Sequence, residues 1–396
     1  MKLLIVVSSL DLTQPFSATP AWWQLMKALY EVGVDVIATP YQGPAIEALW
    51  WRAKENPAKL AGDSFKVARD MLRRISPPQA PEEKPAEVDV DESLSDKAVR
   101  GVAQTVIAPL WQRHLDNILT KEPNIDAVIF LTVPLNQLVG VPKAISEKHN
   151  VPVFFYDGDV PASLPSMKGF HSGFRIYQGA DVTEYTAFIS NSTGGCDELL
   201  AMGAKAAHTL WYAADPQLYS PLDVPKDVDA FFFGHGREYR EQWIDSMIRD
   251  ASNQLPDAKF AVRGKSLGDI GRTKQLPYLS FAKLREYMSR SKLNLVITRG
   301  AHASVYGSSS MRPFELGMIG AAMVANPYDG IELWYEPDKE IIVVNSGEEA
   351  LERYRYLLSH DTEREALGHA ARERALKQHT FQHRARELMA IVQGYI

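Results

Sequence analysis

The chain has 396 residues, of which 45% are hydrophobic and 23% charged, with a net charge of −6 and a single cysteine, Cys196. This length favours two domains, and the diffuse negative charge argues against a nucleic-acid partner and limits any membrane contact to peripheral docking. One cysteine cannot form an intramolecular disulfide, which fits a reducing compartment, and no apolar run approaches the roughly 20 residues that span a bilayer, so we expect a cytoplasmic protein.

The first elements predict a strand, a helix and a second strand. Residues 2–9 (KLLIVVSS) form the continuous apolar run of a buried parallel strand, and their apolar stretch is too short for a signal peptide. Helical spacing follows over residues 17–33, and residues 34–41 (VDVIATPY) form the next strand. Residues 66–100 are rich in proline and acidic side chains, so we expect a mobile surface insertion there.

The alternation of strands and helices then continues in two series. The first has strands at 126–133, 151–159 and 186–192, and residues 221–229 (PLDVPKDVD) are typical of a linker. The second has strands at 229–236, 259–264, 293–298, 321–326 and 340–344, followed by an almost wholly helical end. Such alternation predicts parallel sheets covered by helices on both faces.

We therefore predict an α/β protein of two doubly wound, Rossmann-like domains, at 1–222 and 223–379, with helix 380–396 packing back on the first domain. Ligands of open parallel sheets bind beyond the carboxyl ends of the strands, so the interdomain cleft is the expected active site. The chain has no GxGxxG after its first strand, no P-loop, no zinc-spaced His/Cys cluster and no GxSxG elbow.

Several segments of the second half carry a family resemblance. These are WYAADPQLYSP (211–221), DAFFFGHGREYREQW (229–243), LPYLSFAKLREYMSRSKLNLVIT (276–298), SSSMRPFELGMIGAAMVAN (308–326) and HTFQHRARELM (379–389). In order and spacing they resemble the GT-B nucleotide-sugar glycosyltransferases, closest to the CgeB-like branch that is related to the retaining family 4 enzymes. The first half matches only in architecture.

The resemblance implies a GT-B glycosyltransferase of the hexosyltransferase type. It would be retaining and free of metal and other cofactors, and would move a sugar from a nucleotide-sugar donor to an acceptor of unidentified class: a glycan, a small molecule, a lipid-linked group or a protein. Two departures stand out. Family 4 relatives often carry Glu-x7-Glu, and Gly307 stands where the first acid would be; the first-strand loop, SSLDLTQPFS, lacks their glycine-rich turn.

The segment at 308–326 supplies the first donor-site candidates. Ser308 to Ser310 can cap a helix, and Pro313 is tolerated in a first turn. Glu315 could accept hydrogen bonds from a ribose diol or could simply complement the helix dipole. Arg312 could pair with phosphate oxygens or form a surface ion pair. We expect Ser310, Arg312 and Glu315 to bind the donor.

Basic residues at other strand ends could hold a diphosphate, because a leaving nucleotide diphosphate needs fixed cations. Arg237 and Arg240 follow FFFGHG, with Arg240 the better match to the family's arginine, and Arg263 and Lys265 end the next strand. Arginines on solvated helix faces are the alternative. Tyr278 and Leu279 occupy the position of the family's base-contacting turn, although a buried tyrosine there is equally plausible.

Two further strand ends supply catalytic candidates. Asp157, in FFYDGD, could orient a sugar hydroxyl or act on the acceptor nucleophile, or could simply form an Asp-Gly turn with Asp159 nearby. His302, in TRGAHASVYG, could bond the sugar or a phosphate as a neutral imidazole, or could be incidental. Asn191 and Ser192 are expected to line the cleft.

Two aromatic pairs mark the first domain: Trp22–Trp23 and Trp50–Trp51. We expect one member of each pair in the core and the other stacking on an acceptor sugar or forming an apolar acceptor wall.

The alternative to an active transferase is a catalytically silent GT-B-like nucleotide- or sugar-binding or assembly protein, which the absent first acid and the altered first loop favour. A GT-B epimerase acting on the donor itself is a third, weaker alternative. A screen of nucleotide sugars for hydrolysis or transfer separates the first two.

Overall fold

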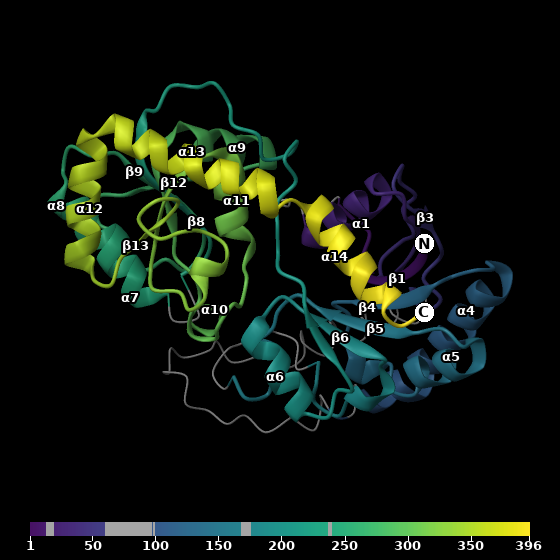
Figure 1. Cartoon of the computed structure of the whole chain (residues 1–396). Coiled ribbons are helices and arrows are strands. Elements are labelled where there is room, and N and C mark those ends of the chain that lie inside the picture. Colours follow the sequence, from purple (N-terminus) through teal and green to yellow (C-terminus); the bar gives the residue numbers. More distant parts are fainter. Residues whose placement is uncertain (13–19, 60–96, 98–99, 168–175, 237–239) are drawn as a thin grey trace.

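The structure is a computed structural model that describes residues 1–12, 20–59, 97, 100–167, 176–236 and 240–396. Most of the predicted insertion at 66–100 and much of the first-strand loop therefore lie outside the described residues. Two parallel sheets organise the rest, one in each half of the chain (Figure 1).

The first half contains a seven-stranded sheet in the order β3-β2-β1-β4-β5-β6-β7, with every pair parallel. Its strands are β1 (Lys2–Ser9), β2 (Asp35–Gln42), β3 (Arg52–Ala53), β4 (Ala127–Leu131), β5 (Val153–Asp157), β6 (Ala187–Ser190) and β7 (Ala207–Thr209). Its helical segments are α1 (Ala21–Glu31), η1 (Ala103–Ile107), α4 (Ala108–Lys121), η2 (Leu135–Gln137), α5 (Val141–His149), η3 (Val182–Glu184) and α6 (Thr193–Ala201).

Strand β1 shows why its sequence is apolar throughout. Leu3, Ile5 and Val7 point into a core shared with α1, whereas Leu4 and Val6 point into a second core shared with α4. Because side chains alternate along a strand, a sheet covered on both faces needs apolar residues at every position.

The second half contains a six-stranded sheet in the order β10-β9-β8-β11-β12-β13, again wholly parallel. Its strands are β8 (Val228–Phe233), β9 (Phe260–Arg263), β10 (Lys274–Gln275), β11 (Ser291–Val296), β12 (Ala322–Ala325) and β13 (Ile342–Val343). Phe231 and Phe233 of β8 enter one core, and Ala230 and Phe232 enter the other. The two sheets confirm the predicted α/β architecture of two doubly wound halves.

The helical segments of this half extend to the end of the chain. They are α7 (Glu241–Ile244), η4 (Asp245–Asp250), α8 (Ala251–Gln254), α9 (Phe281–Arg290), α10 (Gly300–Ser304), α11 (Met311–Ile319), η5 (Ile331–Leu333), α12 (Gly347–Ser359), α13 (Asp361–Gln378) and α14 (Phe381–Gln393). The helix expected after β8 is described from Glu241 and passes through a π-helical stretch, η4. Among the described residues, no helix is long and apolar enough to cross a membrane.

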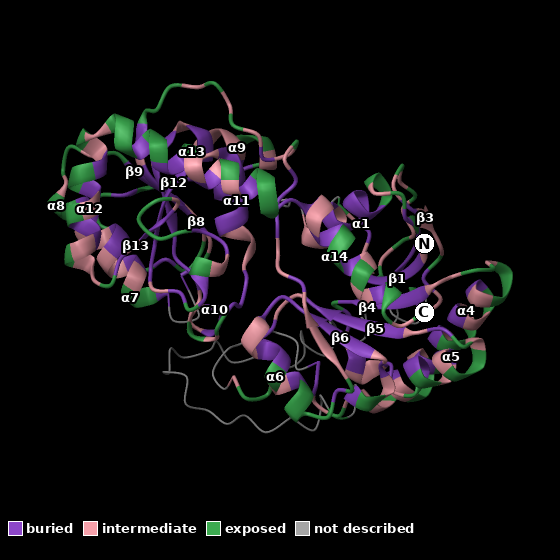
Figure 2. Cartoon of the chain, in the orientation of Figure 1, coloured by how far each residue is buried: buried purple, intermediate pink, exposed green. Residues whose placement is uncertain are grey.

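The last helix leaves the second sheet and lies against the first. Helix α14 packs on α1, and Phe381, Ala385 and Leu388 are buried in the core beneath α1 (Figure 1). Figure 2 shows the purple, buried strands of both halves under helices whose outer faces are green and exposed. Domain limits at 222 and 379 remain a prediction, but the contact of α14 with the first half is plain.

A short contact between two backbone segments, residues 191–194 and 306–309, also joins the two halves, and we call it the ridge. Ser192 and Ser308 form an isolated antiparallel bridge, and the N–H of Gly194 donates to the carbonyl of Tyr306 at 2.9 Å. The side-chain amide of Asn191 donates to the carbonyl of Ser309 at 2.8 Å. The loop before α11 is therefore held by the end of β6 and the start of α6.

Candidate functional site

A pocket of 480 Å³ lies between the two halves, a volume typical of small-molecule sites. Most of its lining follows strand ends, as expected for parallel sheets. From the first half and the connecting segment, the lining residues are Pro20, Ala21, Gly158, Asp159 and Tyr212. From the second half they are Phe233, His235 and Arg240 at and after β8, Thr298, Arg299 and His302 after β11, and Ser310, Met311, Arg312 and Glu315 at the start of α11.

Three polar atoms in this lining are buried without a hydrogen-bond partner among the described residues. They are Thr298 Oγ1, Ser310 Oγ and Arg312 Nε. The hydroxyl of Tyr328 interacts with Ser310 but donates its hydrogen bond to the carbonyl of Ser308. A buried polar atom left unpaired costs about 1–3 kcal/mol, so three of them around one pocket indicate a place that a polar ligand would complete.

Arg312 is fixed by its own half of the chain. Its Nη1 donates to the carbonyl of Ile297 at 2.8 Å, and its guanidinium carbon lies 5.1 Å from the ring centroids of Phe232 and Phe233. Burial lowers the pKa of Arg312 to about 10, so the side chain is still charged at neutral pH. Gly234 leaves room for it, because a Cβ there would lie 2.7 Å from Arg312 Nη2.

Glu315 is buried one turn further along α11. The hydroxyl of Tyr219 donates to Glu315 Oε1 at 2.6 Å. Burial raises the pKa of the Glu315 carboxyl, against smaller opposing effects of Tyr219 and Arg312. Glu315 thus lines the pocket with one carboxylate oxygen already bonded to Tyr219. Tyr219 lies in the segment before the second sheet and was not among the residues predicted from sequence.

Arg240 reaches the pocket at the start of α7. Its Nε donates to the carbonyl of Ile297 at 3.2 Å, and its Nη1 lies 3.4 Å from His235 Nδ1. The loop before it packs tightly on the loop after β9, because a Cβ on Gly264 would overlap the carbonyl oxygen of Gly234. Arg240, before α7, and Arg312, in the first turn of α11, therefore share the carbonyl of Ile297 as a backbone acceptor.

Arg299 links the two sides of the pocket. Its Nη2 donates to Asp159 Oδ1 of the first half, and its Nε donates to His302 Nδ1 at 2.9 Å. Burial, together with the charges of Arg299 and Arg240, holds the pKa of His302 well below its ordinary value. His302 is consequently a neutral ring that accepts a hydrogen bond from Arg299.

Asp157 lies behind the pocket wall and does not line it. Its Oδ2 accepts from the hydroxyls of Ser163 at 2.5 Å and Tyr177 at 2.8 Å, and its Oδ1 accepts from the N–H of Asp159 at 2.8 Å. Complete burial raises the pKa of this carboxyl. Among the two acids of FFYDGD, Asp159 is the one that reaches the pocket.

The serines before α11 do not cap that helix, contrary to the expectation from sequence. Ser308 Oγ lies 2.5 Å from Ser192 Oγ, and Ser309 Oγ donates to the carbonyl of Asn191 at 2.9 Å. Ser310 occupies the N-cap position without a side-chain capping bond. The hydroxyls of Ser308 and Ser309 instead form hydrogen bonds in the ridge between the halves, and the hydroxyl of Ser310 lies in the pocket.

Gly307 belongs to the same ridge. Its φ is +62°, its carbonyl accepts from the N–H of Thr193 at 3.1 Å and from Trp211 Nε1 at 3.1 Å, and a Cβ there would lie 2.8 Å from Thr193 Oγ1. The position that holds an acid in many family 4 relatives is here a buried glycine in contact with the other half.

Four of the predicted donor residues lie apart from this pocket. Arg263 stacks on Tyr278 with its guanidinium carbon 4.1 Å from the ring centroid, and that ring is 52% exposed. Leu279 is buried in the core of the second half, and Lys265 is exposed. Arg237 lies outside the described residues. The structure therefore brings together Arg240, His302, Ser310, Arg312 and Glu315.

The lining residues that sequence reasoning passed over stand next to those it chose. Thr298 and Arg299 follow strand β11 and precede His302, and His235 lies in the FFFGHG turn. These residues also follow strand ends, so the rule that selected the other site residues would have selected them too. Tyr212 and Tyr219 belong to the connecting segment and carried no such signal. Among the described residues, no group of three or more His, Cys, Asp or Glu could hold a metal ion.

Comparison with known proteins places this site in a family context. Residues 237–390 match a family model described as "Glycosyl transferase-like". No curated protein matches the chain.

Solved structures match over nearly the whole length. They include a sucrose-phosphate synthase from Thermosynechococcus elongatus (14% identity, 99% of this chain and 98% of the other, TM-score 0.63) and HepE of Anabaena in complex with UDP (13%, 100% and 100%, 0.60). An Escherichia coli structure described as "Trehalose-6-phosphate" bound with UDP-2-fluoro glucose matches too (11%, 99% and 99%, 0.62). At such identities the likeness shows the fold, which is GT-B.

Proposed function

We propose that the protein is a glycosyltransferase that transfers a sugar from a nucleotide-sugar donor, bound on its second half, to an acceptor that enters from the first. The observation that carries the proposal is a group of buried polar atoms around the interdomain pocket, on Thr298, Ser310 and Arg312, that have no partner among the described residues. The match of residues 237–390 to the glycosyl transferase-like family model supports it, because this part of the chain contains most of the pocket lining.

The donor lies with its diphosphate against Arg312 and Ser310, at the start of α11, and near Arg240. A guanidinium with an unpaired N–H and the positive end of a helix both favour phosphate oxygens. Glu315, whose other partner is Tyr219, accepts from the ribose diol. UDP is the first nucleotide to test, since HepE and the E. coli neighbour were solved with UDP or a UDP-sugar.

The transfer breaks the bond between the anomeric carbon and the diphosphate oxygen. The electron pair leaves with the nucleoside diphosphate, the acceptor oxygen forms the new bond to the same carbon, and the acceptor proton passes to the departing phosphate oxygen. We propose retention, because the pocket groups that could serve as a base to activate the acceptor already have partners. Asp159 and His302 bond Arg299. Glu315 accepts from Tyr219, and His235 Nδ1 lies 3.4 Å from Arg240 Nη1. Arg240, Arg299 and Arg312 stabilise the charge that develops on the leaving group.

Within this scheme Asp157 and His302 are positioning residues. Asp157 accepts the Asp159 N–H and thereby fixes the loop that carries Gly158 and Asp159 to the pocket. His302 fixes Arg299 by accepting from its Nε. Both roles replace the direct chemistry that the sequence suggested for these two side chains.

The test is incubation of the protein with UDP-, GDP- and ADP-sugars, with release of free nucleoside diphosphate as the readout. We expect slow hydrolysis of one donor, absent in the Arg312→Ala variant and faster once the right acceptor is added. Tight binding of a nucleotide sugar without hydrolysis or transfer would instead favour a silent binding protein, which Gly307 in place of the first acid supports. No binding of any donor would refute both.

A further inference from the structure

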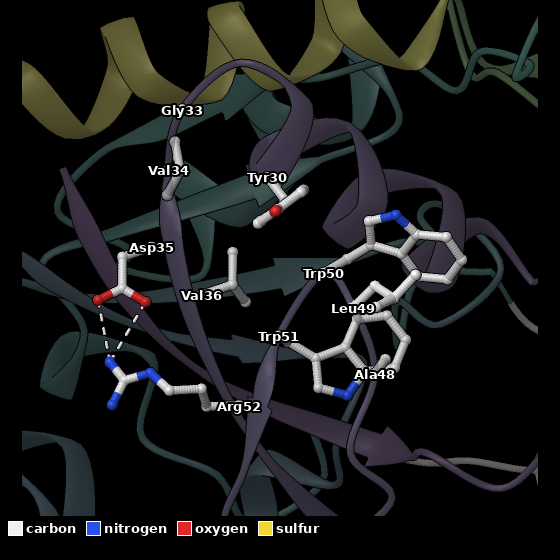
Figure 3. Close-up of a pocket in the computed structure, with 10 residues that line it drawn as sticks. All are labelled: Tyr30, Gly33, Val34, Asp35, Val36, Ala48, Leu49, Trp50, Trp51 and Arg52. Carbon is white, nitrogen blue, oxygen red and sulfur yellow. Dashed lines mark hydrogen bonds and ion pairs between the residues drawn. The ribbon is translucent and has the colours of Figure 1, made fainter.

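A second groove, of 370 Å³, lies on the first half of the chain away from the interdomain pocket. Its lining comes from the end of α1, the starts of β2 and β3, and the turn between those strands (Figure 3). Asp35 and Arg52 are the first residues of β2 and β3, so the groove lies at the amino ends of the strands. Strand β2 has eight residues, which puts the groove about 23 Å from its carboxyl end.

One wall of the groove is apolar and exposed. Leu49 is 84% exposed and Tyr30 is 52% exposed, and Trp50 lies beside them (Figure 3). Hydrogen bonds fix the turn that carries Leu49 and Trp50. Ala48 and Trp51 form an antiparallel bridge across it, and Trp51 Nε1 donates to the carbonyl of Ile46 at 2.9 Å. Large apolar side chains held at the surface this way indicate a contact surface.

The tryptophan pairs divide unevenly. Trp51 is buried in the core, whereas Trp50 is only partly buried and meets Trp23 edge to face, with ring centroids 4.8 Å apart. Trp22 and Trp23 are both partly buried. The expectation of one core member in each pair therefore holds for the second pair, and Trp50 is the member left for a ligand.

The opposite wall carries fixed hydrogen-bonding groups. Asp35 accepts from Arg52 Nη2 at 2.9 and 3.2 Å, and Arg52 Nη1 donates to Glu122 at 3.0 and 3.1 Å. Lys54 Nζ also donates to Glu122 Oε1 at 2.8 Å, and Lys2 Nζ lies 3.9 Å from Asp35 Oδ2. Each carboxylate at this wall therefore has cationic partners, and the wall offers polar contacts whose charges are already paired. The floor between the walls is Val34 and Val36 (Figure 3).

We propose that this groove binds a neutral glycan, as a surface site separate from the transfer site. A sugar ring presents C–H groups on one face and hydroxyls at its edge, which match an aromatic wall opposite a planar, paired carboxylate and guanidinium. The paired charges disfavour an anionic ligand. A protein partner would need about 800 Å² of surface, whereas the large exposed apolar side chains here are Tyr30 and Leu49.

The glycan-binding proposal does not depend on the transferase activity, but a glycan bound in this groove could be the acceptor or the product of the transfer. A glycan held about 23 Å from the carboxyl end of β2 could not react while bound there, yet its far end could reach the interdomain pocket. Such a site would retain an acceptor or product chain near the enzyme and raise its effective concentration.

The test is titration of the full chain with maltohexaose, cellohexaose, laminarihexaose and chitohexaose, followed by tryptophan fluorescence and saturation-transfer NMR. We expect one of the four to bind, Trp50→Ala to weaken it about tenfold or more, and Asp35→Asn to weaken it less. UDP-sugar binding should be unchanged in both variants. Tyr356→Ala, an exposed ring on α12, is the control that should leave glycan binding unchanged.

Three results would overturn the proposal, and the first two concern oligosaccharide binding. One is the absence of binding by all four oligosaccharides to a folded protein, and the other is binding that Trp50→Ala leaves unchanged. Competition by an alkyl chain such as octyl glucoside without competition by glucose would also assign the groove to an apolar ligand. Because UDP-sugar turnover is measured separately, failure of this proposal and failure of the transferase proposal cannot be confused.

Discussion

The two sides of the interdomain pocket differ in how their polar groups are satisfied. On the side of the second half, Thr298, Ser310 and Arg312 each bury a polar atom without a partner among the described residues. On the side of the first half, Asp157 accepts three hydrogen bonds and Tyr212 donates to the carbonyl of Gly158 at 2.5 Å. The second half thus leaves polar groups that a ligand could pair, whereas the polar groups of the first half pair with its own loop.

This difference in hydrogen-bond satisfaction predicts which residues contribute most to the free energy of ligand binding. Unpaired groups in a rigid lining gain the full benefit of a matching ligand, because their desolvation has already occurred on folding. Groups that are already paired must exchange one partner for another. We therefore expect donor binding to depend strongly on residues after β11 and at the start of α11, and acceptor binding to depend on shape.

The largest effect is expected at the ridge between the two sides. Gly307→Glu would restore the acid of related enzymes, but it would force a positive φ on a non-glycine residue and place Cβ 2.8 Å from Thr193 Oγ1. We expect the free energy of unfolding to fall by about 3 kcal/mol or more without a gain in activity. Urea unfolding measures this.

A matched control for that substitution is Gly268→Glu. Gly268 has a φ of +67°, and a Cβ added there would have no described atom within 4 Å beyond its chain neighbours, so the variant reports backbone strain alone. If both variants lose the same stability, the contact with Thr193 is unimportant. An active and stable Gly307→Glu protein would show that the ridge leaves room for the acid.

Arg312→Ala tests the ligand-receiving side directly. Loss of the charged donor should raise the Kd for UDP by about 30- to 100-fold, or 2–3 kcal/mol, while the melting temperature stays equal or rises because a buried charge is removed. Calorimetry gives both values. Arg113→Ala, on the exposed side of α4, should leave the Kd unchanged, and an unaltered Kd in Arg312→Ala would remove Arg312 from the donor site.

Asp157→Asn tests whether the first half is structural. An amide cannot accept from Ser163, Tyr177 and the Asp159 N–H at once, so the variant should lose about 2 kcal/mol of stability. Its kcat should fall only in part, and its KM for the donor should change little. A complete loss of turnover with unchanged stability would return Asp157 to a direct catalytic role.

Glu315→Gln should separate ribose binding from diphosphate binding. We expect UDP to bind about five- to tenfold more weakly while inorganic pyrophosphate binds equally well, because about 1 kcal/mol of hydrogen bonding to the ribose is lost. If both ligands weaken equally, Glu315 does not contact the ribose.

The same variant has a predicted pH signature. Burial raises the pKa of Glu315 in the folded chain, so the wild type loses stability as pH rises from the unfolded pKa through the folded pKa. Glu315→Gln lacks this loss. It should be more stable than the wild type at pH 8, and the difference should shrink as pH falls toward the ordinary glutamate pKa. Urea unfolding at several pH values checks the sign.

The smallest effect is expected for Asp159→Asn. The ion pair with Arg299 joins the two sides, but the Asp159 side chain is 36% exposed, so its removal should cost at most about 1 kcal/mol. The salt dependence of stability should also weaken slightly. A loss above about 2 kcal/mol would mean that this pair, rather than the backbone ridge, holds the two sides together.

Much of the fold was predictable because it rests on local patterns. Apolar runs such as residues 2–9 are long enough to show strands buried on both faces, and their alternation with helical periodicity implies two parallel sheets. The C-terminal half of the site was accessible as well, because strand ends are visible in sequence. Arg240 was chosen for that reason, whereas Arg312 and Glu315 were chosen at the start of a predicted helix in a segment that carries the family resemblance. All three line one pocket.

The remaining site residues depended on which strand ends meet and on which polar groups already have partners. Asp157 and Asp159 are two positions apart in FFYDGD, yet one is buried behind the wall and the other pairs with Arg299. Arg263 and Tyr278 satisfy each other outside the pocket. No local pattern distinguishes these outcomes, because each depends on atoms more than a hundred residues away or on a neighbouring loop.

By itself, therefore, the sequence determined the architecture and the order of its elements, which follow from periodicity and turn chemistry acting over a few residues. The class of ligand was implied by the resemblance of its motifs to a known family. Tertiary structure alone decided that Gly307 lies in a ridge between the halves, that Ser308 and Ser309 serve that ridge, and that Thr298, Ser310 and Arg312 each keep a buried polar atom unpaired among the described residues. Hydrogen-bond satisfaction is a property of the whole packed chain, so only the folded structure shows which polar groups a ligand could complete.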